Sequence, residues 1–227
     1  MIEFLNVTKE YSDTLALDNV SFSIEDGEFV FIVGHSGAGK TTMTKLMLHE
    51  ETVTSGRIFV DGTDVTALKK SQIPYYRRKL GMVFQDFRLF SDKTAYENIA
   101  CVMRAVGTPG AEIRRRVPAL LRTVSMESRE KHFPRQLSGG EQQRIALARA
   151  IANNPDIIIA DEPTGNIDPK MSIDIMNMLM RINKLLGKTV IVVTHEESLV
   201  DTMGQRIITI KDGKLVSDKP AVEVSDE

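Results

Sequence analysis

Three short runs of apolar residues are the clearest feature of the hydrophobic pattern. They cover residues 29–33, 157–160 and 190–193. The runs are unbroken rather than alternating, which is typical of strands with both faces buried, as in a parallel sheet covered by helices. The first run leads into a glycine-rich turn and then a predicted helix over residues 42 to about 50. The pattern therefore predicts an α/β core with a parallel sheet.

The rest of the pattern divides the chain into three kinds of segment. Residues 4–7, 20–24 and 57–60 are separated by turn residues, which predicts ordinary antiparallel strands. Residues 92–152 are mostly helical in pattern with few β-branched runs, which indicates a helical subdomain inserted between strands of the core. Residues 218–227 are polar and acidic, so we expect them to form a loose tail.

Composition narrows the class of protein. The 227 residues are 42% hydrophobic and 26% charged, as in ordinary globular proteins. We expect a single domain whose core is formed by residues 1–91 and 153–217. The 29 Lys and Arg against 31 Asp and Glu give a net charge of −2, so nucleic acid is not an expected partner. The single cysteine, Cys101, excludes an internal disulfide framework and fits a reducing compartment.

The sequence gives no sign of secretion or of a membrane span. The N-terminus lacks the basic head and the long apolar stretch of a secretory signal. No apolar run approaches the roughly 20 residues that a membrane helix needs. We therefore expect a cytosolic protein that acts at a membrane only through a partner.

A phosphate-binding pattern follows the first apolar run. Gly34 and Gly39 have four residues between them and are followed by Lys40-Thr41. The glycines let the backbone curl so that successive N–H groups point at a phosphate, and a helix beginning near Lys40 adds the positive end of its dipole. In this pattern the lysine reaches the β- and γ-phosphates and the threonine hydroxyl holds Mg²⁺. A chance glycine-rich turn is the alternative, but the strand before it and the helix after it favour the phosphate loop. The residues expected to bind nucleotide here are Gly34, His35, Ser36, Gly37, Ala38, Gly39, Lys40, Thr41 and Thr42.

An acidic pair follows the second apolar run. Asp161 and Glu162 come directly after residues 157–160. At the carboxyl end of a parallel strand, Asp161 can orient the Mg²⁺ shell and Glu162 can polarise the water that attacks the γ-phosphate. Taken alone, Asp-Glu-Pro after a strand fits a turn or a helix cap equally well. Together with the phosphate loop, the pair favours a catalytic site.

The string Leu-Ser-Gly-Gly-Glu-Gln-Gln-Arg over residues 137–144 is the most specific in the chain. It begins a predicted helix, with Ser138 as the cap and Gly139 and Gly140 exposing the first N–H groups to an anion. An ordinary capped helix would also explain these residues. The string resembles the signature motif of ABC ATPases, and other motifs of that family appear in the expected order.

The resemblance implies roles for further residues. Gln85 matches the glutamine that touches Mg²⁺ and the attacking water. Residues 166–168 resemble the D-loop, with Ile167 where leucine is more usual. His195 resembles the histidine that contacts the γ-phosphate, although a lone histidine after a strand is more often structural. Tyr11 resembles the aromatic residue that stacks on adenine, or it belongs to the core. The implied catalytic residues are Glu162, His195 and Gln85, and the implied metal ligands are Thr41, Gln85 and Asp161.

The resemblance covers residues 2 to about 216 and implies a fold. ABC ATPases are P-loop NTPases with a RecA-like core, an N-terminal antiparallel β subdomain and an inserted helical subdomain. It also implies ATP and Mg²⁺ as cofactors. The family forms a homodimer in the ATP state, in which Ser138, Gly139 and Gly140 of one copy would close on the nucleotide at Lys40 of the other.

Within the family, the chain resembles the bacterial cell-division branch. This likeness rests on residues 34–40, 84–90, 92–100, 113–117 and 133–137. Members of the branch pair with the membrane protein FtsX at the cytoplasmic face of the membrane, where the ATP cycle signals to peptidoglycan hydrolases at the division septum. ATPases for lipoprotein release, efflux or amino-acid import share much of this sequence, so such a transporter subunit is the alternative.

Proteins of other classes fit less well. Soluble ABC proteins that act on ribosomes or DNA usually carry two cassettes or a long coiled coil, whereas this chain has one phosphate loop and no sustained heptads. A GTPase or kinase would leave the signature string unexplained. A catalytically dead module is expected to have lost Lys40, Glu162 or His195, and all three are present.

A short apolar group follows Gln85. We expect Phe87, Leu89 and Phe90 to line a groove that receives a cytoplasmic helix of the membrane partner, because large apolar side chains in a surface loop are costly to leave in water. The alternative is that they pin the helical subdomain to the core. Residues 114–116 are three arginines that either add contacts to the partner or to lipid, or form a solvated helix face.

Overall fold

The computed structural model describes residues 1–222. The chain divides into two compact units. Unit 1 consists of Met1–Arg77 and the chain from Asn183 onward, and unit 2 consists of Arg78–Ile182. Unit 2 is therefore an insertion within the sequence of unit 1.

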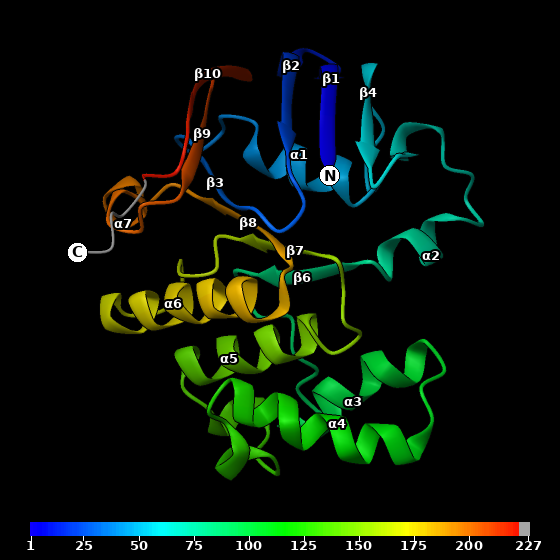
Figure 1. Ribbon diagram of the computed structural model, residues 1–227, viewed down its shortest axis with the longest axis vertical. Helices are drawn as coiled ribbons and strands as arrows, with labels where there is room; N and C mark the ends of the chain where they lie inside the picture. The colour runs from blue at the N-terminus through cyan, green and yellow to red at the C-terminus, as the bar shows by residue number, and fades with distance from the viewer. Residues whose placement is uncertain (223–227) are drawn as a thin grey trace. The chain divides into compact units, whose positions relative to one another are not determined.

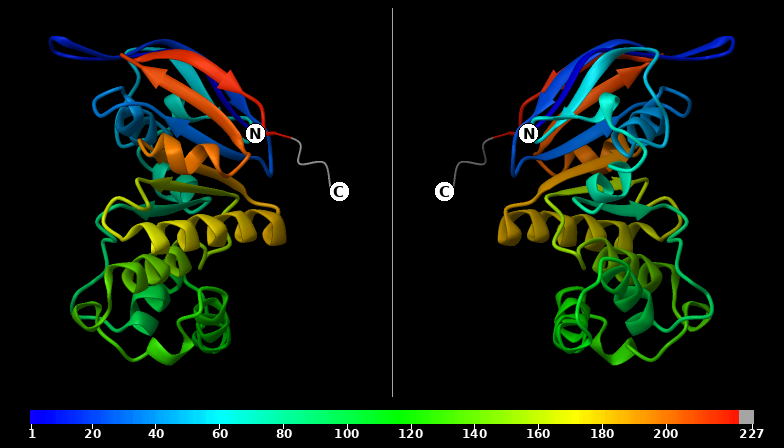
Figure 2. Two further views of the ribbon diagram at one scale, coloured as in Figure 1. Left: turned by 90° about the vertical axis from the view of Figure 1, so that its left-hand side faces the viewer. Right: turned by 90° about the vertical axis from the view of Figure 1, so that its right-hand side faces the viewer.

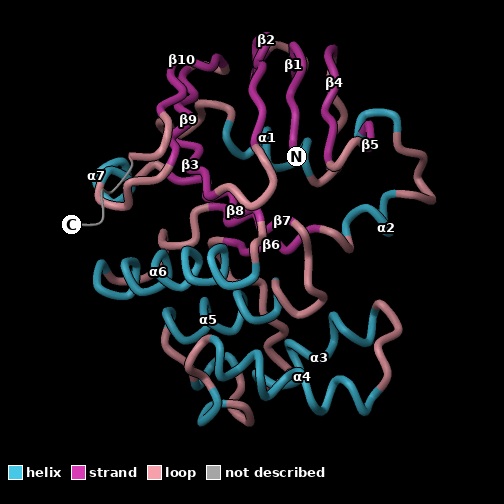
Figure 3. The backbone as a smooth tube through the Cα atoms, in the orientation of Figure 1, coloured by secondary structure: helices cyan, strands magenta, loops and turns pink. Residues whose placement is uncertain are grey.

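Unit 1 contains an antiparallel sheet. Its strands are β1 (Ile2–Tyr11), β2 (Thr14–Ile24), β4 (Ser55–Val60) and β5 (Thr63–Asp64), in the order β2-β1-β4-β5. Figure 3 shows β1, β2 and β4 side by side. The three strands expected from the sequence are confirmed, and β1 and β2 are longer than expected because they pair along most of their length. The ring of Phe4 stacks on that of Phe22 across the pair, with 4.5 Å between centroids.

Unit 1 also contains the first and third apolar runs. They form β3 (Phe29–Val33) and β8 (Thr189–Thr194), which pair in parallel, and every residue of both strands is buried. This burial is the reason for the unbroken apolar pattern. On the other side of β3 lies β9 (Arg206–Lys211), also parallel, followed by the antiparallel strand β10 (Lys214–Lys219). Figure 1 shows the four strands in the order β10-β9-β3-β8.

The end of β10 corrects part of the expected tail. Residues 218 and 219 were expected to be loose but belong to the strand. The carboxylate of Asp218 accepts hydrogen bonds from Arg206 on the neighbouring strand, at 2.8 and 2.7 Å. Arg206 also binds Glu28, and these carboxylates raise the pKa of its guanidinium. Residues 223–227 of the expected tail lie outside the described residues.

Short helices complete unit 1. They are α1 (Lys40–Met47), α2 (Ile73–Arg77), α7 (Glu197–Asp201) and the 3₁₀ turn Val65–Ala67. Helix α1 begins two residues earlier and ends sooner than the expected stretch 42–50. After it, the carbonyls of Leu48 and His49 accept hydrogen bonds from Arg77 instead of continuing the helix.

Unit 2 joins a strand pair to a group of helices. Strands β6 (Leu80–Phe84) and β7 (Ile157–Asp161) are parallel. Between them the chain forms α3 (Ala95–Ala105), α4 (Gly110–Thr123), α5 (Gly139–Ala150) and the 3₁₀ turns Glu127–Arg129 and Pro134–Gln136. Helices α3, α4 and α5 pack on one another, as the green ribbons of Figure 2 show. Helix α6 (Pro169–Leu186) follows β7, and its last residues, from Asn183 on, belong to unit 1. Within residues 1–222 no helix is both long and apolar enough to cross a membrane.

Candidate nucleotide-binding site

The phosphate loop leaves the end of β3 through positions that only glycine fits. A Cβ on Gly34 would lie 2.1 Å from the carbonyl oxygen of Ile210, and one on Gly39 would lie 2.5 Å from that of Ala16. Gly37 and Gly39 also have φ of 81° and 107°, in the left-handed region that favours glycine. The two spaced glycines of the sequence pattern are thus required by the close approach of neighbouring backbone.

Lys40 turns back over this loop. It is the first residue of α1 and is 6% exposed. Its ammonium donates to the carbonyls of Gly34 at 2.7 Å and His35 at 3.2 Å. No acidic residue lies in the first turn of α1, so the helix start and the lysine present positive potential together. A buried cation over a curled glycine loop fits a polyphosphate.

Other residues of the loop and the first turn are open to solvent. Ser36 and Thr41 are exposed, and Thr42 is half-buried. The His35 ring lies 3.2 Å from the carboxylate of Asp212, measured from Nε2. Thr41 therefore lies exposed at the start of α1, where the sequence pattern predicts a metal ligand.

His195 and Tyr11 lie in the same unit as the loop. Val33 pairs with Thr194 in the parallel register, so His195 and Gly34 follow neighbouring strand ends. His195 is exposed. Tyr11 is half-buried at the end of β1, and the ammonium of Lys9 lies 4.6 Å from the centre of its ring. One face of the ring is therefore in contact with a cation.

In unit 2, the parallel register brings together the ends of β6 and β7. Phe84 pairs with Asp161, so Gln85 and Glu162 follow at adjacent strand ends. Glu162 has φ of 48°, a left-handed conformation that a non-glycine residue adopts at a cost of about 1–3 kcal/mol. Such strain occurs where the surrounding structure imposes it, and often at functional sites.

The D-loop residues contact Gln85. The side-chain amide of Asn166 donates to the carbonyl of Gln85 at 2.9 Å. Gly165 packs against the side chain of Gln85, because a Cβ on this glycine would lie 2.6 Å from Gln85 Nε2. The backbone and the side chain of Gln85 are thus both held by the segment that follows Glu162.

The signature string begins α5 with a capping box. Ser138 Oγ accepts from the N–H of Glu141 at 3.3 Å, and the Glu141 carboxylate accepts from the N–H of Ser138 at 2.8 Å. The first main-chain helix bond runs from Gln142 N–H to Ser138 O, so the N–H groups of Gly139 and Gly140 precede it. These two amides therefore lie outside the main-chain hydrogen-bond ladder of the helix.

The carboxylate of Glu141 has a pKa below its ordinary value. The hydrogen bond from the Ser138 N–H is the first cause, and Arg129 adds a hydrogen bond at 3.0 Å. Both favour the charged form of Glu141. The capping box is therefore ionised at neutral pH.

Sequence reasoning gave no role to two polar residues of α5. The amide of Gln143, which is fully buried, donates to the carbonyl of Pro163 at 2.7 Å. Arg149 donates to the carbonyls of Phe87 and Arg88. Gln143 could have been found from the sequence, because it is a polar residue three positions after Gly140 on a helix face that is otherwise apolar.

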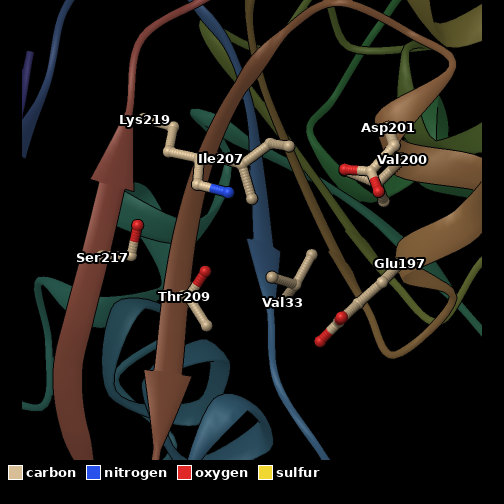
Figure 4. Close-up of a pocket in the computed structure, with 8 residues that line it drawn as sticks. All are labelled: Val33, Glu197, Val200, Asp201, Ile207, Thr209, Ser217 and Lys219. Atoms are coloured by element: carbon tan, nitrogen blue, oxygen red, sulfur yellow. The ribbon is translucent and has the colours of Figure 1, made fainter.

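A separate cavity of about 340 Å³ lies in unit 1 between β3, β9, β10 and α7 (Figure 4). None of the expected nucleotide-binding residues lines it. Apolar and polar side chains share its wall, namely Val33, Glu197, Val200, Asp201, Ile207, Thr209, Ser217 and Lys219.

Comparison with known proteins decides the family. Residues 17–165 match the family model described as ABC transporter. The chain belongs to the ABC transporter family. It is 46% identical to the cell division ATP-binding protein FtsE of Bacillus subtilis, over 96% of both chains. It is 44% identical to the protein of the same name from Escherichia coli, over 95% of this chain and 97% of that one.

Solved ABC cassettes have the same fold. The ATP-binding cassette MJ0796, in a dimer bound to ADP and Pi, superposes with a TM-score of 0.87 and 40% identity, over 97% of this chain and 98% of that one. CbiO1 of Clostridium perfringens, from a transporter complex, superposes with a TM-score of 0.90 and 30% identity, over 96% and 87%. The expected ABC-type P-loop fold is confirmed, and the chain is an ABC-type ATP hydrolase that resembles FtsE proteins.

Proposed function

We propose that this ABC ATPase hydrolyses ATP with Glu162 polarising the attacking water. The observation that carries the proposal is the left-handed Glu162 at the end of the buried strand β7. Turn residues such as Asp61 and Asp212 also adopt this conformation, but Glu162 adopts it directly after a buried parallel strand, where it fixes the direction of a carboxylate. This position at the end of a parallel strand favours a catalytic site over a plain turn.

In this proposal, residues of unit 1 bind the phosphates of the nucleotide. The Lys40 ammonium and the N–H groups at the start of α1 supply the positive potential for the β- and γ-phosphates. His195 contacts the γ-phosphate, and Tyr11 stacks on the adenine with the ring face that Lys9 does not cover.

The donor set fits Mg²⁺. The Thr41 hydroxyl, the Gln85 amide oxygen and the Asp161 carboxylate are hard oxygen donors, which this ion prefers. Within the part of the chain that the structure describes, no three His, Cys, Asp or Glu side chains form a cluster. This agrees with a Mg²⁺ that takes part of its coordination from phosphate oxygens rather than from a protein cage. When bound, Mg²⁺ neutralises negative charge on the transferred phosphoryl group.

The signature helix acts on a second copy of the chain. Ser138, Gly139 and Gly140 are proposed to close on the γ-phosphate bound at Lys40 of the partner, which gives a symmetric dimer with two sites. The two helix amides ahead of the first α5 bond support this role, because they are free of the helix ladder. Dimeric cassettes of the relative MJ0796 support it as well.

The cellular role of the chain is inferred from its similarity to FtsE proteins. We propose that the ATP cycle changes the conformation of the membrane protein FtsX, and that the chain works at the cytoplasmic face of the bacterial membrane at the division septum. FtsX in turn regulates peptidoglycan hydrolysis. The identity to FtsE proteins over nearly the whole chain supports this proposal.

The hydrolytic assignment is tested with two variants that separate binding from chemistry. Lys40→Ala removes the charge that holds the phosphates and should abolish ATP binding. Glu162→Gln keeps binding and should lower turnover by ~10²–10⁴, the usual contribution of a positioned general base. Nucleotide binding and phosphate release are measured for both. Normal turnover in Glu162→Gln contradicts the assignment.

A further inference from the structure

The turn that contains Gln85 has two consecutive residues in an unfavourable conformation. Phe87 and Arg88 have φ of 57° and 48°, in the left-handed region, and neither is glycine. The N–H of Phe87 donates to the carbonyl of Phe84 at 3.2 Å, which closes a turn with Gln85 and Asp86 at its centre. Left-handed conformations of side-chain-bearing residues persist only where neighbouring groups impose them.

The neighbouring group in this case is Arg149, in the last turn of the signature helix α5. One guanidinium nitrogen donates to the carbonyl of Phe87 at 2.8 Å, and the other donates to the carbonyl of Arg88. The planar fork of an arginine can hold two adjacent carbonyls, whereas a lysine ammonium lacks this fixed geometry. Both left-handed residues are thus bound by one side chain.

Arg149 is half-buried, and the two hydrogen bonds of its guanidinium end on main-chain carbonyls. Arg149 forms no ion pair with a carboxylate among the described residues, and burial lowers the pKa of its guanidinium. Hydrogen bonds from a charged donor are stronger than those between neutral groups, so the two carbonyls of the turn are firmly held.

The other end of α5 contacts the same turn. A Cβ on Gly139 would lie 3.7 Å from the tip of the Phe87 ring, so this ring packs against the signature motif. The ring of Phe87 therefore meets the start of α5, while its carbonyl is bound by Arg149 from the end of α5. One helix therefore contacts the turn at two points.

We propose that Arg149 is a positioning residue for Gln85. It holds the left-handed turn and so transmits the position of the signature helix to the glutamine, whose own carbonyl is fixed on its other side by Asn166. The catalytic consequence rests on the proposed role of Gln85 toward Mg²⁺ and the attacking water. The hold on the turn does not rest on that role.

The first test measures the turn without nucleotide. Hydrogen–deuterium exchange over residues 85–90 is followed in the full-length protein and in Arg149→Met. Losing two charge-assisted hydrogen bonds should speed exchange there at least about tenfold. The matched control is Arg116→Met, since Arg116 on α4 also donates to a main-chain carbonyl, that of Ala152. The control should leave exchange over residues 85–90 unchanged.

A second variant pair tests the backbone argument. Glycine adopts the left-handed region without strain, so Arg88→Gly placed in the Arg149→Met background should restore part of the slow exchange. Arg149→Lys keeps the charge and most of the volume and should give an intermediate rate. If Arg149→Met does not fold, the same comparison is made in the Arg149→Lys background.

The effect of Arg149 on catalysis is tested with a double-mutant cycle. Arg149→Met should lower turnover in the wild-type background and should cost little further in the Gln85→Ala background, because both changes act through one residue. Two results would contradict the role of Arg149 as a positioning residue. One is unchanged exchange over residues 85–90 in a folded Arg149→Met protein. The other is an equal loss of turnover with and without Gln85, which indicates a general structural role. If Gln85→Ala has normal turnover while exchange responds as expected, the role proposed for Gln85 fails and the hold on the turn stands.

Discussion

The buried side-chain amide of Gln143 donates to the carbonyl of Pro163 across 2.7 Å. Pro163 directly follows Glu162, whose left-handed backbone marks the proposed catalytic position. The Oε1 atom of Gln143 has no hydrogen-bond partner among the described residues. Gln143 of the signature helix therefore holds the residue next to the proposed catalytic glutamate through a hydrogen bond.

Gln143→Met should slow hydrolysis clearly while it lowers the stability of the protein only slightly. The variant leaves the Pro163 carbonyl without its donor, which costs about 1–3 kcal/mol, but it also removes the unpartnered Oε1 atom. The two effects partly offset, so we expect a net loss of stability of about 1 kcal/mol. Turnover should fall because Glu162 is less firmly placed. Urea unfolding and phosphate release are measured together, and normal turnover in this variant contradicts the argument.

The lowered pKa of Glu141 should make the stability of the protein fall at low pH, and a single variant should remove this contribution. Its pKa is lowered by the Ser138 N–H, so its contribution is fully present above the ordinary pKa of a glutamate and is lost as the pH falls through the lowered value. Glu141→Gln keeps a capping box that does not titrate. The melting temperature of the wild type should therefore exceed that of the variant near neutral pH, and the gap should shrink as the pH is lowered toward about 3. A gap that stays constant with pH contradicts the prediction.

ATP should bring two copies together. The Glu162→Gln variant should bind ATP without consuming it, so that the signature helix of one copy stays closed on the nucleotide of the other. Light scattering should report a dimer with Mg-ATP and a monomer without it. Lys40→Ala is the control and should stay monomeric in both conditions. A monomeric Glu162→Gln protein in saturating Mg-ATP counts against the head-to-tail arrangement.

The apolar group after Gln85 should bind the membrane partner. Phe90 is 49% exposed, while Phe87 is half-buried. The side chain of Asn98 holds both main-chain polar groups of Phe90, at 2.8 and 3.1 Å, so the backbone is fixed although the ring is exposed. Replacing Phe87 and Phe90 with serine should abolish capture by FtsX in membranes.

Folding and the ATPase activity of the free protein decide how this result is interpreted. The single variant Phe90→Ser should keep both, because its ring contributes little to the core. Since the ring of Phe87 packs at the signature helix, the double variant is compared with Phe87→Ser alone. If capture persists in the double variant, the partner binds elsewhere. If folding fails in Phe90→Ser, the residue belongs to the core.

The local patterns of the sequence determined the elements and most of the candidate chemistry. The apolar runs 29–33 and 190–193 are unbroken because both faces of β3 and β8 are buried, so the parallel sheet could be predicted. The glycine spacing of the phosphate loop is equally local, as is the capping box of Ser138 and Glu141. Each of these signals is contained within a few neighbouring residues, so elementary backbone geometry is enough to interpret it.

The tertiary structure decided which of these residues meet. Only the parallel register of Phe84 with Asp161 places Gln85 beside Glu162, and a register is set by packing between strands that are distant in sequence. The left-handed turn at Phe87 has no sequence signature, because it contains no glycine. The hydrogen bond that holds it joins residues 62 positions apart and ends on a main-chain carbonyl, which every residue type possesses. The role of Arg149 therefore became visible only in the folded chain.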